Sequence, residues 1–314
     1  MSATTATEKE QRTAPAPPSR TRSGLREGRA AWVLALPFCL LFLLFTVWPV
    51  IQSLFMSVTD TTSRDLRTPF AVDLVGFENY ARALGDDKFL TSMANTGFFV
   101  VIGVPLTLAV ALATAVALDK GIQRLRAFFR LGFYLPVITS IIAVAVVWRF
   151  IYQTDGGLLN TALGWFGVDG PNWLGSETWS KPAVLLMIVW RNFGTGMIIF
   201  LAGLQSVPAS LLEAAAIDGA NSWKRFWHIT FPLLRPTLLF VSVTTMIGYL
   251  QIFEEPFVLT SGGPLDSTLT MSMYTYQQFS FGNYGYAASM SYLIFVVIAV
   301  VTAIQFRLLR ENQS

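Results

Sequence analysis

Residues 213–232 read EAAAIDGANSWKRFWHITFP, and this stretch lies between two long apolar runs. Upstream, Pro208 suits the first turn of a helix and Ser210 could cap one. The alanine-rich residues 211–218 are then expected to form a compact helix. Gly219, which tolerates backbone conformations closed to other residues, permits a sharp change of direction after it.

A second short helix is predicted on the far side of that glycine. Ser222 can cap a helix over residues 223–229, which Pro232 then limits. Two short helices meeting at a glycine would form a knob on a membrane face that a partner could hold. The alternative is an amphipathic hairpin whose aromatic residues, Trp223 among them, lie in the lipid headgroup region.

The composition places this knob in a membrane protein. The chain has 314 residues, 53% hydrophobic and 13% charged, whereas a soluble domain carries about 25% charged residues. Mean hydropathy is +0.53. The lone Cys39 cannot form an internal disulfide, and the lone His228 excludes a metal site built from several histidines. We therefore predict an all-α polytopic membrane protein and no metal site.

Six apolar runs are each long enough to cross about 30 Å of hydrocarbon, and each is expected to be helical because a spanning segment must satisfy its own backbone. The runs cover residues 30–57, 96–118, 129–152, 183–205, 237–258 and 286–308, within a domain over 30–310. Prolines interrupt several of them and indicate a bundle around a cavity. Residues 1–29 are interpreted as a disordered basic tail and 311–314 as a short C-terminal tail. The first run is too long for a cleaved signal peptide.

Lysine and arginine favour one set of connecting segments, those on the side of the N-terminus, about threefold. Basic residues concentrate on the cytoplasmic side of membrane proteins. This bias predicts that both termini are cytoplasmic. It also predicts that residues 206–236, which contain the knob, face the cytoplasm.

The pattern Glu213-Ala-Ala-x-x-x-Gly219, followed after nine residues by Ile229-x-x-Pro232, resembles the EAA loop of ABC-type import permeases. In that family the loop forms coupling helices that dock into a groove on the ATP-binding subunit. The family usually has leucine where this chain has Phe231. The resemblance implies that the ATPase-coupling residues are Glu213, Ala214, Ala215, Asp218, Gly219, Trp223 and Pro232.

Two further elements narrow the resemblance. Residues 76–80 read Gly-Phe-Glu-Asn-Tyr, and residues 259–264 read Leu-Thr-Ser-Gly-Gly-Pro. Both look like elements of the carbohydrate-importing, maltose-type permeases, in the same order. The implied fold is the six-span type I ABC importer permease. The implied assembly, in the bacterial cell membrane, contains a second related permease as heterodimer partner, two ATP-binding subunits and an extracytoplasmic solute-binding protein that delivers a sugar.

Polar residues within the fourth and fifth runs mark a candidate solute site, because such groups are costly in a membrane. Sugars are held by aromatic faces together with amide and carboxylate hydrogen bonds. The candidate substrate-binding residues are Trp190, Arg191, Asn192, Gln251, Glu254 and Glu255. The alternative is an ion-pair cluster that also includes Arg149. Tyr249, Tyr274 and Tyr276 could line the route, although aromatics at the membrane interface are the usual case.

Other functions remain open at this level. An importer for glycerol phosphate or a polyamine would share the coupling loop, and a stand-alone secondary transporter would not need one. The chain lacks the Gly-x-x-x-x-Gly-Lys-Ser/Thr motif that cradles nucleotide phosphates. We therefore expect no catalytic residues and no cofactor on this chain, with ATP and Mg²⁺ on partner subunits. Nothing in the sequence suggests a nucleic-acid partner.

Overall fold

The computed structural model describes residues 24–65, 72–121 and 125–310, and the chain divides into two units, residues 1–52 and 53–314. The first unit holds α1 (Gly24–Phe42), a π-helical turn η1 (Leu43–Val47) and the start of α2 (Trp48–Ser57). Of the predicted tail 1–29, residues 1–23 lie outside the described part, and α1 already begins at Gly24. The predicted tail 311–314 also lies outside it.

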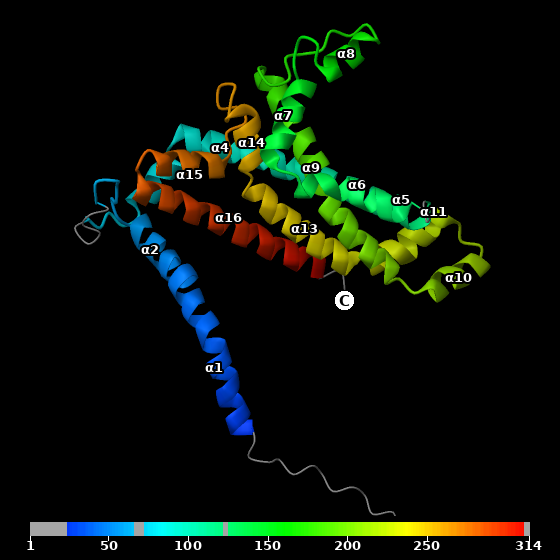
Figure 1. Ribbon diagram of the computed structural model, residues 1–314, viewed down its shortest axis with the longest axis horizontal. Helices are drawn as coiled ribbons and strands as arrows, with labels where there is room; N and C mark the ends of the chain where they lie inside the picture. The colour runs from blue at the N-terminus through cyan, green and yellow to red at the C-terminus, as the bar shows by residue number, and fades with distance from the viewer. Residues whose placement is uncertain (1–23, 66–71, 122–124, 311–314) are drawn as a thin grey trace, which may run out of the picture. The chain divides into compact units, whose positions relative to one another are not determined.

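The second unit is built of helices, and the β-structure in its described part is one isolated bridge between Thr59 and Leu74 (Figure 1). In chain order the helices are α3 (Glu78–Leu84), α4 (Asp87–Phe98), η3 (Phe99–Gly103), α5 (Val104–Lys120), α6 (Arg126–Ile138), α7 (Ile141–Ile151), α8 (Leu158–Gly164), α9 (Glu177–Gln205), α10 (Ala209–Ile217), α11 (Ser222–Arg225), η4 (Phe226–Thr230), α12 (Phe231–Leu233), α13 (Arg235–Leu250), α14 (Glu254–Thr260), α15 (Met271–Ser280) and α16 (Tyr284–Arg310).

Within the described residues, four helices are long and apolar enough to cross a membrane. They are Trp32–Ser57, Asp87–Lys120, Glu177–Gln205 and Tyr284–Arg307. Two bent helix pairs raise the number to six if each pair is one span. These pairs are Arg126–Ile138 with Ile141–Ile151, bent by 98°, and Ser222–Leu233 with Arg235–Leu250, bent by 67°. Each of the six predicted runs overlaps one of these segments, although the fifth, 237–258, extends beyond Leu250.

The third run, 129–152, is one of those that a proline interrupts, and it is broken into α6 and α7. The backbone of Thr139 is extended, with φ −80° and ψ 145°, and α7 begins two residues later. Pro136 lies in the last turn of α6, where its missing N–H leaves the carbonyl of Gly132 without its helical donor. The Thr139 hydroxyl donates to the carbonyl of Leu135 at 2.7 Å, which gives that carbonyl a donor at the helix end.

The fifth run, 237–258, also contains a break, because α13 ends at Leu250 and α14 begins only at Glu254. Pro256 has no N–H, so it could not bond the carbonyl of Ile252 in a continuous helix. That carbonyl instead accepts a hydrogen bond from the Thr270 hydroxyl at 2.7 Å. Glu254 and Glu255 therefore lie in the first turn of a new helix and not inside the span.

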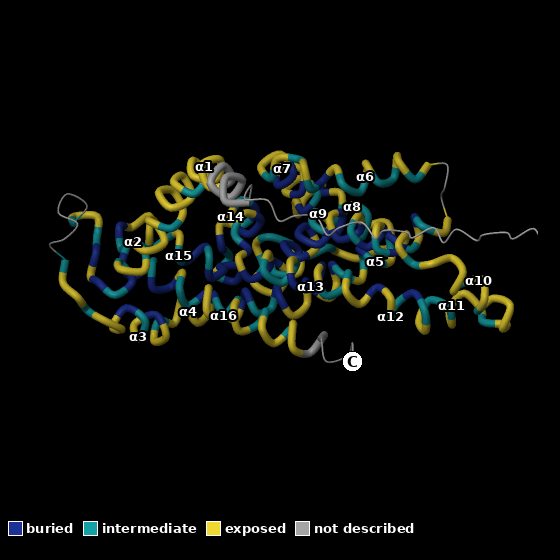
Figure 2. Tube along the Cα trace, turned by 90° about the horizontal axis from the view of Figure 1, so that it is seen from below, coloured by how far each residue is buried: buried dark blue, intermediate teal, exposed yellow. Residues whose placement is uncertain are grey.

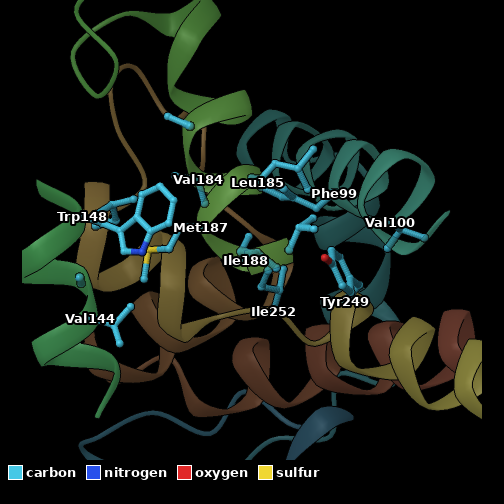
Figure 3. Packing of buried hydrophobic residues seen from close by; sticks show 14 of the residues in the cluster. Phe99, Val100, Val144, Trp148, Val184, Leu185, Met187, Ile188, Tyr249 and Ile252 are labelled. Carbon is cyan, nitrogen blue, oxygen red and sulfur yellow. The ribbon is translucent and has the colours of Figure 1, made fainter. Parts of the chain in front are cut away.

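The core of the second unit runs along α5 and α9, which pack against each other along their lengths (Figure 2). One buried cluster gathers apolar side chains from η3, α7, α9 and α13, among them Phe99, Trp148, Ile188 and Tyr249 (Figure 3). A second cluster, with Ala111, Phe200 and Leu234, continues toward the other end of α9. Small residues allow these close approaches. A Cβ placed on Gly196 would lie 3.0 Å from the Cβ of Ala111.

Gly194 sets the contact between α9 and α6. A Cβ at this position would lie 2.3 Å from the carbonyl oxygen of Phe133, a backbone atom that cannot rotate away. Gly194→Ala should therefore push the helices apart and lower the stability of the protein by about 1–3 kcal/mol. Gly132→Ala on α6 is the control, because its Cβ would meet nothing within 4 Å. Equal melting temperatures of the two variants in detergent would contradict this packing.

A polar cluster ties the start of α4 to α15 and α16. Asp86 caps α4, accepting from the backbone N–H of Lys88 at 2.9 Å. Its other oxygen accepts from the hydroxyls of Tyr274 at 2.6 Å and Tyr286 at 2.8 Å. The side chain of Tyr274, which the sequence left open between the solute route and the membrane interface, is buried in this cluster. Burial and the hydrogen bond to Asp86 raise the pKa of Tyr274 to about 12.

The same cluster predicts a pH dependence of stability. Burial pushes the pKa of Asp86 upward, but the hydrogen bonds from both tyrosines and two backbone amides outweigh it, and the pKa lies below its ordinary value of 3.8. The carboxylate thus contributes stability above the unfolded-state pKa, and this contribution is lost as pH falls through the folded-state pKa. Asp86→Asn should lower stability by about 1–2 kcal/mol at neutral pH.

The measurement is Tm against pH for the wild-type protein and Asp86→Asn. The difference between them should narrow as the pH is lowered from about 5 to about 3, because protonation removes what the substitution has already removed. A difference that stays constant over this range would show that the Asp86 carboxylate does not stabilise the fold through its charge.

Candidate functional site

A cavity of about 510 Å³ opens between α5, α9, α13 and the segment 251–255. Its lining is Thr107, Ile188, Asn192, Thr195, Gly196, Ile199, Val241, Thr244, Thr245, Gly248, Tyr249, Gln251, Ile252, Phe253, Glu254 and Glu255. The wall thus combines apolar surface with hydroxyl, amide and carboxylate groups. This size and mixture are typical of a site for a small polar solute.

Four of the six sequence-predicted substrate residues line this cavity: Asn192, Gln251, Glu254 and Glu255. Trp190 and Arg191 are not part of the lining. The ring of Trp190 instead packs edge-on against Trp148, with centroids 5.5 Å apart. Residues two apart on a helix point about 200° apart, so Trp190 and Asn192 cannot share one face of α9.

Arg191 joins α9 to the first turn of α14. Its Nη1 lies 2.9 Å from Oε1 of Glu255, a residue with 6% of its surface exposed. The Asn192 amide lies 3.4 Å from the same oxygen. Nη2 of Arg191 is 3.7 Å from the carboxylate of Glu254. The ion-pair alternative therefore holds for Arg191 and Glu255, which anchor the break between α13 and α14 beside the cavity.

Arg149 does not join this cluster, contrary to the ion-pair alternative as stated from the sequence. Its guanidinium donates to the backbone carbonyls of Val258 and Leu259, near the other end of α14. These carbonyls belong to the last turn of a helix, where cations are favoured. The two arginines thus hold opposite ends of the same short helix.

Tyr249 lines the cavity, which is one of the two positions that the sequence left open for it. Its side chain is 3% exposed, and its hydroxyl lies 2.6 Å from that of Thr107 on α5. Figure 3 shows the ring beside Ile188 and Ile252 in the packed centre. A Cβ on Gly103 would lie 2.2 Å from this ring, so the glycine makes room for it. In the sequence, Gly103 and Thr107 lie four residues apart and so share one face of a helix. That pattern could have indicated a contact with a large side chain there.

The predicted turn in the knob is confirmed at Gly219, whose φ is +82°. Its N–H bonds the carbonyl of Ala216 at 3.1 Å, and the N–H of Ala220 bonds that of Ala215 at 2.9 Å. This pair of bonds is the Schellman arrangement, which ends a helix on a left-handed residue. Glycine adopts that conformation without the steric cost of a side chain.

The predicted helix caps around this turn are wrong. Ser210 lies inside α10, and Asn221 rather than Ser222 caps α11, accepting from the N–H of Lys224 at 2.8 Å. Pro232 does not end the second helix either, because η4 and α12 continue it to Leu233. The π-helical turn just before Pro232 widens the helix there, which relieves the crowding that a proline ring causes.

The predicted coupling residues are mostly at the surface. Glu213, Ala214, Asp218, Gly219 and Trp223 are exposed, whereas Ala215 and Pro232 are half-buried. The segment is anchored at its far end by Leu234, which is 2% exposed. A Cβ on Gly203 of α9 would lie 3.0 Å from the Leu234 side chain. The corner between α12 and α13 therefore rests directly on α9.

Known proteins resemble this chain over nearly its whole length. The lactose transport system permease protein LacF of Rhizobium radiobacter is 36% identical over 288 residues, which cover 90% of this chain and 94% of that protein. The trehalose/maltose transport system permease protein MalF of Thermococcus litoralis is 32% identical over 292 residues, covering 92% and 96%.

The fold also matches a solved structure. A chain of a bacterial ABC transporter involved in the import of the acidic polysaccharide alginate superimposes with a TM-score of 0.77 at 22% identity, covering 93% of this chain and 99% of that one. The family model of binding-protein-dependent transport system inner membrane components matches residues 103–311. The resemblance seen in the sequence is thereby confirmed: the chain belongs to the family of binding-protein-dependent transport system inner membrane components.

Proposed function

We propose that this chain is the permease subunit of an ABC importer that takes up a sugar or oligosaccharide delivered by an extracytoplasmic binding protein. The observation that carries the proposal is the cavity between α9 and α13. Asn192, Gln251 and Glu254 offer amide and carboxylate partners there for sugar hydroxyls, and Tyr249 offers an aromatic wall. The lactose and trehalose/maltose permeases among its relatives support a carbohydrate.

The geometry suggests how the knob would drive this cavity. The segment from α10 to α12 connects the end of α9 directly to the start of α13, and these two helices form facing walls of the cavity. Leu234 fixes the corner against α9. A partner that moved the knob as a rigid body would therefore shift both walls together, which is the motion alternating access requires.

The proposal includes the rest of the assembly. Two ATP-binding subunits would bind the knob and hold ATP and Mg²⁺, so this chain is not itself an enzyme. A second related permease would complete the pathway, and the six segments would cross the bacterial cell membrane with both termini in the cytoplasm. Support for a binding-protein partner comes from a structural relative, a bacterial alginate ABC transporter in complex with an alginate pentasaccharide-bound periplasmic protein.

The test is purification of the tagged chain from its native membrane in mild detergent. An ATP-binding subunit and a second permease should co-purify in stoichiometric amounts. In proteoliposomes, the complex should hydrolyse ATP faster when the binding protein is added with a sugar from a panel of disaccharides and trisaccharides, and it should accumulate that sugar. ATPase stimulation by an amino acid or polyamine, with none by any sugar, would refute the carbohydrate assignment.

A further inference from the structure

We infer that the cavity selects sugars that carry no negative charge and rejects acidic ones, such as uronates and sulfonated or phosphorylated sugars. This inference rests on the proposed function and concerns the charge of the solute rather than its identity. The residue that sets the selection is Glu254. The argument starts from the charged groups around the cavity.

The cavity is lined by two carboxylates, those of Glu254 and Glu255, and by no lysine, arginine or histidine. The nearest guanidinium is that of Arg191, which lies behind the wall with 17% of its side chain exposed. Arg149 is also directed elsewhere, since it bonds the carbonyls of Val258 and Leu259. One guanidinium thus serves two carboxylates, which leaves this wall with a formal charge of −1.

The two carboxylates are not equivalent. Glu255 is 7% exposed at its side chain and its Oε1 accepts from Arg191 at 2.9 Å, so its charge is compensated within the protein. Glu254 is 59% exposed at its side chain and has only a longer contact of 3.7 Å with Arg191. Its oxygens therefore remain available to a solute. They accept hydrogen bonds from sugar hydroxyls or ammonium groups but offer no donor to an anionic group.

In the protein, this excess negative charge repels an anionic solute more strongly than it would in water. An anion about 5 Å from a carboxylate in a site of effective dielectric near 20 is repelled strongly enough to lower binding on the order of 100-fold. The Arg191 guanidinium, 3.7 Å from the Glu254 carboxylate, offsets part of this repulsion, so we expect a smaller preference, about 10-fold. A neutral hydroxymethyl group at the same place meets no such penalty and can donate to Glu254.

The experiment uses matched probe pairs that differ only at carbon 6: methyl glucoside with methyl glucuronide, and methyl galactoside with methyl galacturonide. Binding is titrated against the assembled importer in nanodiscs, without the binding protein, by saturation-transfer-difference NMR. The neutral member of at least one pair should bind at least about 10-fold more tightly. In Glu254→Gln the two members should bind within about threefold of each other.

Two further variants keep the test specific. Glu254→Asp retains the charge and should retain the preference for the neutral probe. Glu177→Gln removes an exposed carboxylate at the start of α9, outside the cavity, and should bind both probes as the wild-type complex does. Equal binding of neutral and acidic probes to the wild-type complex, or an unchanged ratio in Glu254→Gln, overturns the charge selection alone. Failure of every sugar to bind or to be transported overturns the proposed function with it.

Discussion

Arg191→Met should destabilise the protein by about 3–5 kcal/mol, the largest loss of stability that we expect from a single substitution outside the apolar core. The reason is that the substitution leaves Glu255 without its cationic partner. Glu255 is 6% exposed, and its only cationic partner within the described residues is Arg191. Removal of the guanidinium leaves a buried carboxylate without compensation. The anchor between α9 and the start of α14 is lost at the same time.

A double-mutant cycle separates the cost of the uncompensated carboxylate from the cost of the lost anchor between α9 and α14. Arg191→Met combined with Glu255→Gln removes both charges and should recover most of the lost stability, because no uncompensated ion remains. Arg149→Met is the matched control. Arg149 bonds two backbone carbonyls and no carboxylate, so its removal should cost only about 1–2 kcal/mol. Denaturation in detergent measures four variants: Arg191→Met, Glu255→Gln, the double variant and Arg149→Met. An Arg191→Met protein as stable as the control would refute the pairing.

The sequence located the long helices well, because an uninterrupted apolar run permits little else in a membrane. The fourth run, 183–205, corresponds to α9, and the sixth, 286–308, corresponds to α16. The two runs that contain breaks were harder to predict. The signal for the second break was Pro256, whose missing N–H frees the carbonyl of Ile252. Only the folded chain reveals that Thr270, eighteen residues after Ile252, satisfies that carbonyl.

The candidate site was likewise predicted only in part. Polar residues in apolar runs identified Asn192, Gln251 and Glu254 as unusual, and all three line the cavity. Composition alone could not assign Trp190 to the opposite face of α9, because that depends on the rotation of the helix about its axis. For Tyr249 the sequence left two positions open, the solute route and the membrane interface. Its burial depends on the space left by Gly103, on a helix more than 140 residues away in the sequence.

Gly219→Leu should abolish most sugar uptake, by at least about 10-fold, without preventing membrane insertion. The left-handed conformation at φ +82° costs a residue with a side chain about 1–2 kcal/mol. No atom lies within 4 Å of the position that the Cβ would take, so the leucine causes no clash. The chain can therefore fold, but the corner between α10 and α11 is biased away from the geometry that we expect the ATPase to bind.

Gly167→Leu provides a closely matched control. Gly167 also has positive φ, +74°, and open space around its Cβ position, but it follows α8, far along the chain from the knob. Equal strain without an effect on uptake would assign the loss in Gly219→Leu to the coupling segment.

Glu213→Lys tests the same surface through charge, because it reverses an exposed carboxylate on α10 without altering the backbone. ATP hydrolysis that no longer responds to the binding protein is the expected signature in both knob variants. Gly219→Leu acts through backbone strain and Glu213→Lys through charge. Wild-type sugar uptake in both variants would therefore refute the coupling role of this loop.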